Sequence, residues 1–181
     1  MPETNRASLA LIGALVVGAV VSVSLGAYGR VHDPTFESIT TLGFSTLPQM
    51  KAWLATLAAV LALVQLITAL RMYGRLGSGK PSRAVAITHR TSGVVAVLVT
   101  LPVAYHCLWS LGFETYSNRV LVHSVLGCLF YGVFVAKMLT LKIKRAPGWA
   151  IPLLGGATFA VLIGVVSTSA FWYFAQGSPS Y

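Results

Sequence analysis

Acidic residues and cysteines are scarce in this chain. Its 181 residues include four Asp and Glu against thirteen Lys and Arg, and 9% of residues are charged whereas 56% are apolar. Soluble globular domains carry about a quarter of their residues as charges, so this composition excludes that class. The two cysteines, Cys107 and Cys128, do not form a metal-binding Cys-x-x-Cys pair. Phosphate loops and nucleophile-elbow motifs are also missing from the sequence.

Five long apolar runs are present instead. They cover residues 7–28, 52–72, 84–111, 120–141 and 149–174. Each run is long enough to cross a hydrocarbon core of about 30 Å as a helix, which takes roughly 20 residues. The sequence therefore predicts an all-α integral membrane bundle, with five transmembrane helices in one domain over residues 1–181 and the lipid bilayer as its surroundings.

Basic residues gather in the connections after the second and the fourth run. They are Arg71, Arg75, Lys80 and Arg83 in the first of these, and Lys137, Lys142, Lys144 and Arg145 in the second. Cytoplasmic loops of membrane proteins carry an excess of Lys and Arg. Both connections are therefore predicted to be cytoplasmic, which places the N-terminus inside the cell and the tail 176–181 outside. The net charge of +9 follows from this bias and does not indicate nucleic acid as a partner.

Small residues inside the runs indicate where helices approach closely. Gly156 and Gly164 lie in the fifth run with Ala160 between them, and Gly13 and Gly18 lie in the first. Without large side chains, helix backbones can pack tightly in lipid. These positions are predicted helix contacts and do not indicate a function.

Three of the four histidines, His89, His106 and His123, lie inside predicted helices, whereas His32 lies in an outer loop. Ionisable groups at membrane depth usually mark a cofactor, ion or proton site. His106 is about one turn from the outer end of the third run, and His123 is about one turn into the fourth from the same side. A hairpin of these runs brings both imidazoles to one level near the outer leaflet. Two such rings suit the iron of a b-type haem, so both are predicted axial ligands.

Residues near these histidines fit a haem. Gly127 follows His123 by one turn, and a glycine there clears space for a flat macrocycle. Arg119 and Tyr105 lie near the outer surface and are candidates for binding the propionates. These positions predict one haem b per chain, with iron held by His106 and His123.

His89 lies near the inner end of the third run, about 25 Å from His106 at 1.5 Å per residue. One haem therefore cannot use both histidines. His89 and Arg90 are predicted to contact a quinone head group or to take up protons from the inner side, because imidazole and guanidinium can hydrogen-bond a quinone carbonyl. Gly93 stands one turn after His89 and would clear space for a macrocycle. A second haem at His89 stays open, and it would need a methionine as its other ligand.

Two short motifs carry a family resemblance. The run HRTSG at 89–93 and the run HSVLG at 123–127 resemble motifs of the transmembrane cytochrome b561 and ferric-reductase-like cytochromes. The first run is also similar to the cytochrome b subunit of succinate dehydrogenase, where that segment lies near the quinone. This resemblance, which covers the third and fourth runs, implies a b-haem bundle that exchanges electrons with a quinone or a redox partner protein, as the electron-transfer subunit of an oxidoreductase. The length and five-helix layout also resemble small, largely uncharacterised membrane proteins of high-GC Gram-positive bacteria.

Two alternatives come from other classes of protein. The first is a cofactor-free membrane anchor or assembly subunit, in which the histidines only hydrogen-bond between helices. The second is a zinc- or copper-handling membrane protein that uses His106 and His123 with His32 or Asp33, because neutral imidazole is a good ligand for both metals. The oligomeric state is open in all three interpretations.

Overall fold

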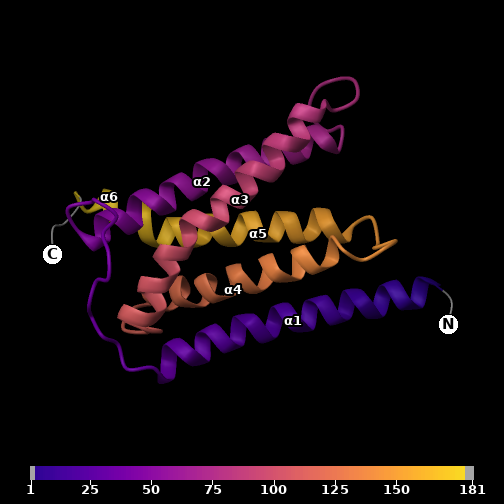
Figure 1. Ribbon diagram of the computed structural model, residues 1–181. Helices are drawn as coiled ribbons and strands as arrows, with labels where there is room; N and C mark the ends of the chain where they lie inside the picture. The colour runs from indigo at the N-terminus through magenta and orange to yellow at the C-terminus, as the bar shows by residue number, and fades with distance from the viewer. Residues whose placement is uncertain (1–2, 178–181) are drawn as a thin grey trace. The chain divides into compact units, whose positions relative to one another are not determined.

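The computed structural model describes residues 3–177, which form five long helices and no strand (Figure 1). The helices are α1 (Glu3–Val31), α2 (Leu47–Met72), α3 (Arg83–Tyr105), α4 (Asn118–Thr140) and α5 (Ala150–Val166). The π-helical segment η1 (His106–Leu111) continues α3, while η2 (Ser167–Phe171) and the short α6 (Trp172–Ala175) continue α5. All five are long and apolar enough to cross a membrane. The predicted all-α class is thus confirmed, and residues 178–181 of the predicted outer tail lie outside the described residues.

Helix ends follow from capping residues that hydropathy alone does not reveal. Helix α2 begins at Leu47 and not at residue 52, because the Thr46 hydroxyl accepts a hydrogen bond from the Gln49 N–H at 3.3 Å. Pro48 fits here because the first helical turn does not need its N–H. Residues 47–51, which lie outside the apolar run 52–72, therefore form the start of the helix. Ser82 and Ser117 cap α3 and α4 in the same way.

The chain divides into two compact units. The α1–α4–α5 unit comprises the chain up to Thr35 together with Leu111–Val165, and the α2–α3 unit comprises Phe36–Ser110 together with the chain from Val166 onward. Helix α1 packs on α4 in the first unit, and α2 packs on α3 and on η2 in the second. Figure 1 shows α2 and α3 joined by the short connection that follows Met72.

Glycines bring α1 and α4 into backbone contact. A Cβ added at Gly18 would lie 2.5 Å from the carbonyl oxygen of Gly132, and one added at Gly132 would overlap the Oγ of Ser22. Further along, the space beside Gly26 is bounded by Cys128, so the two helices run antiparallel. Close approach of this kind replaces the hydrophobic effect as the source of helix association in lipid.

Within the α2–α3 unit, one face of α2 is made of small side chains. Ala52, Ala55, Ala59 and Ala62 recur every three or four residues and are buried. This spacing places them on one side of the helix, where they allow neighbouring helices to approach. The alanine row ends at Gln65, where α2 meets α3 through polar side chains.

Candidate functional site

His106 is only 1% exposed and occupies the first position of η1, where the α-helix widens to a π-helix. Its Nδ1 atom lies 2.7 Å from the carbonyl oxygen of Pro102, one turn earlier. A carbonyl oxygen can only accept a hydrogen bond, so Nδ1 carries the ring proton and the neutral ring has its lone pair at Nε2. That Nε2 atom is buried and has no hydrogen-bond partner among the described residues.

An unpaired buried acceptor is unusual, because buried polar atoms are nearly always hydrogen-bonded. A metal-binding histidine has this arrangement: one ring nitrogen donates to a carbonyl, which fixes the tautomer and the ring orientation, and the other nitrogen binds the metal. The π-helical turn that begins at His106 is also a feature frequently found at functional sites. The surroundings of His106 therefore suit a neutral imidazole ligand.

An aromatic cluster lies beside His106. The ring of Tyr105 meets the His106 ring edge-on, with centroids 5.5 Å apart, and stacks on Trp109 at the same distance. Tyr105, a predicted propionate partner, thus packs its ring against its own helix and is partly exposed. Tyr105 thus lies against one side of His106, and Trp109 packs on Tyr105 from the next turn of the same helix.

Ser110 ties the chain before α2 to the helix segment that carries His106. The buried Ser110 hydroxyl donates to the carbonyl oxygen of Glu37 at 2.8 Å, and the Ser110 carbonyl accepts from the N–H of Phe36 at 3.0 Å. Phe36 has a positive φ of 55°, which is costly for a residue with a bulky side chain. The two hydrogen bonds hold this segment in place four residues beyond His106.

Met50 is a buried residue at the level of His106 that the sequence analysis did not single out. Both side chains are almost completely buried. The contact between Thr68 of α2 and His89 of α3 shows which positions of the two helices lie side by side. Met50 lies 18 residues back along α2 and His106 lies 17 residues on along α3, which is about 26 Å in either case. Its thioether is a soft group that can serve as a haem ligand.

His123 lies on α4 in the other unit, where it is partly buried. Arg119 precedes it by one turn and Gly127 follows it by one turn, so the three residues share a face of the helix. A Cβ added at Gly127 would meet no heavy atom within 4 Å, which leaves open space beside His123. The Ser124 hydroxyl donates to the carbonyl oxygen of Glu114 at 3.1 Å and so fastens the connection before α4.

The two predicted axial ligands thus belong to different units. His106 lies five residues before the end of its span at Leu111, and His123 lies five residues after the start of its span at Asn118. Each ring is therefore about 7.5 Å along its helix from the end next to the connection 112–117. The pairing of the two rings stays a prediction.

His89 belongs to a polar cluster between α2 and α3, which we call the Gln65 cluster: Gln65, Thr68, His89 and Ser92. The Gln65 amide donates to the carbonyl oxygen of His89 and, at 2.7 Å, to the hydroxyl of Ser92. The Thr68 hydroxyl donates to the carbonyl oxygen of Val64 at 2.6 Å, so it accepts from His89 Nδ1 at 2.9 Å. His89 is thereby fixed with its proton on Nδ1 and its lone pair on Nε2.

Gly93 lies against this cluster. A Cβ added there would be 3.1 Å from Oε1 of Gln65, so the amide of Gln65 fills the space that was predicted for a macrocycle. Arg90, the other predicted quinone contact, is exposed. Gln65 and Thr68 were not predicted as site residues. The signal for them was present, because they are among the few polar side chains inside a mostly apolar helix.

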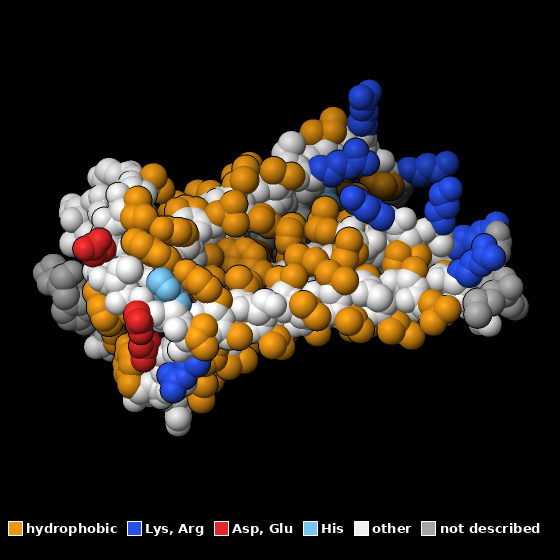
Figure 2. All heavy atoms as spheres, turned by 60° about the horizontal axis from the view of Figure 1, so that its bottom comes forward, with side chains coloured by type: hydrophobic (Ala, Val, Ile, Leu, Met, Phe, Trp, Pro, Cys, Tyr) orange, Lys and Arg blue, Asp and Glu red, His pale blue; other side chains and the backbone are white. Residues whose placement is uncertain are grey.

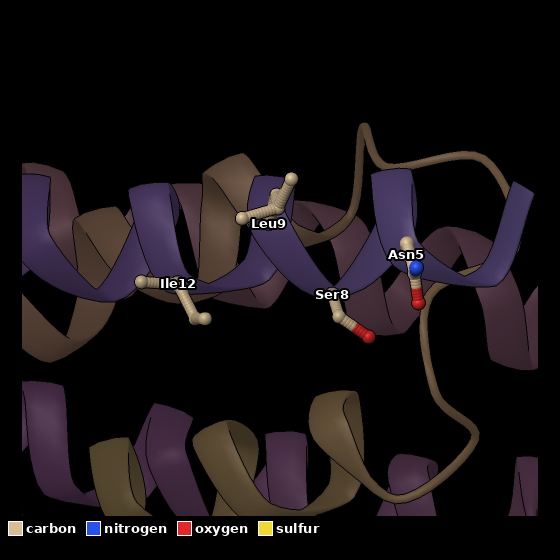
Figure 3. A pocket seen from close by; sticks show the side chains of 4 residues that line it. All are labelled: Asn5, Ser8, Leu9 and Ile12. Atoms are coloured by element: carbon tan, nitrogen blue, oxygen red, sulfur yellow. The ribbon is translucent and has the colours of Figure 1, made fainter. Parts of the chain in front are cut away.

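His32 and one surface pocket are two further features of residues 3–177. His32 stacks on Tyr28 with ring centroids 5.0 Å apart. Across residues 3–177, no three His, Cys, Asp or Glu side chains are grouped so that they could hold a metal ion. The shallow pocket in Figure 3 is lined by Asn5, Ser8, Leu9 and Ile12, all from α1, and contains none of the histidines.

Five apolar spans with histidines inside two of them define the class as a multi-pass helical membrane protein. Within this class, the chain belongs to a family of unknown function, DUF6529, whose model matches residues 11–180. No match was found among curated proteins or among solved structures.

Proposed function

We propose that this protein is a membrane-bound b-type haem protein that transfers electrons, with His106 and His123 as the axial ligands. The observation that carries the proposal is the buried Nε2 of His106, which has no hydrogen-bond partner among the described residues. The hydrogen bond from Nδ1 to the Pro102 carbonyl fixes the orientation of the ring. The sequence resemblance to cytochrome b561-like proteins supports the same conclusion. Haem bound in this way exchanges one electron at a time.

The residues of each unit have distinct tasks in this proposal. In the α2–α3 unit, the Pro102 carbonyl fixes the tautomer of His106, and burial keeps water away from the ring. On α4, Arg119, His123 and Gly127 follow one another along one face, from the helix start inward. That order provides a cation for propionates, an imidazole for iron, and open space for the macrocycle plane.

Electrons are exchanged with a quinone or a redox partner protein in this proposal. His89 is the residue assigned to the quinone head group, since Thr68 leaves its Nε2 lone pair as a hydrogen-bond acceptor. This site lies about 25 Å along α3 from His106. A hydroxyl of the reduced ring, the quinol, would be recognised at the opposite end of the helix from the haem, because it can donate to Nε2.

The proposed orientation follows the basic residues: the N-terminus and the connections after α2 and α4 are cytoplasmic, and the C-terminus is outside. A reporter fused after Tyr181 should be active outside the cytoplasm, and one inserted at residues 77–80 should be active inside. Detection of both reporters on one side of the membrane would refute this orientation.

One absorption spectrum of the detergent-purified protein, oxidised and then reduced, tests the function directly. We expect close to one haem b per chain and the sharp reduced bands of a six-coordinate, low-spin iron. His106→Ala and His123→Ala should each abolish these bands, because loss of either axial ligand leaves the iron five-coordinate or unbound. Lys144→Ala changes an exposed side chain and should leave the spectrum unaltered.

The other outcomes identify other functions. If His123→Ala keeps the low-spin bands and Met50→Ala loses them, Met50 and not His123 is the partner of His106. Zinc or copper without iron in the purified protein would favour metal handling through His106 and His123. A colourless, metal-free protein would favour the membrane anchor or assembly subunit.

A further inference from the structure

The first turns of α3 carry two exposed arginines on one face of the helix. Arg83 is the first residue of α3, and Arg90 follows seven residues later, so their side chains leave the helix in nearly the same direction. Within residues 3–177, neither guanidinium makes an ion pair or hydrogen bond. In the sequence, positions 38–113 contain no Asp or Glu that could neutralise them.

Arg90 lies inside the candidate membrane span, about 10 Å along the axis from Arg83. A charged side chain at that depth turns its end toward the membrane interface, where its charge is solvated. The phosphates of lipid head groups lie at the interface. The planar guanidinium presents its N–H groups in a fork that matches two phosphate oxygens.

The same face of α3 continues as an exposed apolar stripe. Ile87, Val94 and Leu98 are each at least half exposed. Ile87 lies between the two arginines, and Val94 and Leu98 follow Arg90 along the helix. A cationic end followed by an apolar stripe matches the shape of a phospholipid, with its phosphate at one end and its acyl chain beyond.

The α2–α3 connection adds positive charge in an ordered form. The guanidinium of Arg71 donates to the carbonyl oxygens of Ser78 and Gly79, at 2.9 and 3.0 Å. These bonds close the turn that carries Arg75 and Lys80, both of which are exposed. Lys and Arg side chains stand out from a mostly hydrophobic surface in Figure 2. The turn therefore presents further cations just ahead of Arg83.

We propose that Arg83 and Arg90 bind the phosphate of an anionic phospholipid, whose acyl chain lies along the stripe of Ile87 and Val94. The site is independent of haem, so its test does not depend on the proposed function. Basic residues near an anionic membrane surface each contribute about fivefold to binding, so loss of both arginines should weaken retention roughly twenty-five-fold.

Native mass spectrometry of the full chain in detergent, with added phosphatidylglycerol or phosphatidylcholine, tests the site. Wild type should retain phosphatidylglycerol in preference to phosphatidylcholine, and Arg83→Gln/Arg90→Gln should lose that preference. Lys142→Gln/Lys144→Gln is the matched control, because it removes two exposed cations from the other basic connection. The control should retain phosphatidylglycerol as the wild type does.

Three results would overturn the proposal. Equal loss in the arginine and lysine variants would mean that net charge, and not this face, holds the lipid. Unchanged retention in the arginine variant would exclude the two residues. Full displacement of phosphatidylglycerol by excess inorganic phosphate would show that the acyl chain contributes nothing. Should Arg83→Gln/Arg90→Gln fail to fold, Arg83→Lys/Arg90→Lys carries the test, because it keeps the charge and loses the fork, and retention must then fall below wild type.

Discussion

His106 donates its Nδ1 proton to the carbonyl oxygen of Pro102, 2.7 Å away and one turn earlier on the same helix. This bond consumes one ring nitrogen and directs the other, Nε2, into a buried position without a partner. The protein thus bears the desolvation cost of a polar atom that gains no hydrogen bond in return, which is about 1–3 kcal/mol. Such a cost is offset if an iron atom or another electron-pair acceptor occupies that position.

The hydrogen bond from His106 to Pro102 predicts which added imidazoles can replace the missing side chain of His106→Gly. His106→Gly should lose the low-spin haem spectrum, and added imidazole should restore it by entering the vacated space. Imidazole can bind iron and still donate to the Pro102 carbonyl, whereas 1-methylimidazole has no N–H for that bond. A hydrogen bond contributes about 0.5–1.5 kcal/mol, so imidazole should act at roughly two- to thirteenfold lower concentration than 1-methylimidazole. Titration of the absorption spectrum measures both, and equal potency would show that the Pro102 bond does not orient the ligand.

The contact between Gly18 and Gly132 makes a prediction about stability. Gly132→Ala adds a Cβ that overlaps Ser22 and the backbone of Gly18, so α1 and α4 must separate. Forced overpacking costs about 1–3 kcal/mol of unfolding free energy. Gly155→Ala is the control, because a Cβ there meets no heavy atom within 4 Å, and it should be neutral or slightly stabilising. Denaturant unfolding in detergent measures the difference, and similar stability of the two variants would contradict the close contact.

The five spans could be predicted from the sequence because the length and hydropathy of a run are local properties. Which residues contact a neighbouring helix is not a local property of the sequence. Gly18 and Gly164 were identified as small residues at contacts, and both lie against neighbouring helices, whereas Gly13 and Gly156 meet nothing within 4 Å. Whether a glycine is a contact depends on which face of the helix meets another, and the sequence does not state that face.

The residues around His106 and His89 likewise divide into those recognisable from the sequence and those that depend on how the helices pack. Histidines inside apolar runs were recognisable, but the tautomer of His106 depends on a side chain that reaches back one turn at the start of a π-helix. Pro102 is a local signal for a bend in this run, but it does not specify that the helix widens at His106. Gln65 was visible as a polar residue in α2, and its pairing with Ser92 emerges only when the register of α2 and α3 is known.

Gln65 and Gly93 should be energetically coupled. Gly93→Ala places a Cβ 3.1 Å from Oε1 of Gln65 and should displace the amide from His89 and Ser92. Interhelical hydrogen bonds in membranes contribute about 0.6 kcal/mol on average, so a cost near 1 kcal/mol is expected. In a Gln65→Ala background the crowding is gone, and Gly93→Ala should then cost less. Unfolding of the two single variants and the double variant gives the coupling, and strict additivity would show that Gly93 does not serve Gln65.

His89 should serve electron exchange without holding the haem. His89→Ala should leave the reduced spectrum almost unchanged, because the residue is about 25 Å along α3 from His106. The same variant should slow reduction by a quinol analogue, since it removes the Nε2 acceptor. Thr68→Val keeps the imidazole but removes the hydroxyl that accepts from Nδ1, so the ring loses its fixed tautomer and the rate should fall less than in His89→Ala.

Thr158→Val is the matched control, because the Thr158 hydroxyl donates to the Leu154 carbonyl within α5 and should not affect the rate. Stopped-flow absorbance of the haem bands measures each rate. Loss of the pigment in His89→Ala would instead make His89 an iron ligand, and an unchanged rate in both α2–α3 variants would remove the quinone from this end of the helix.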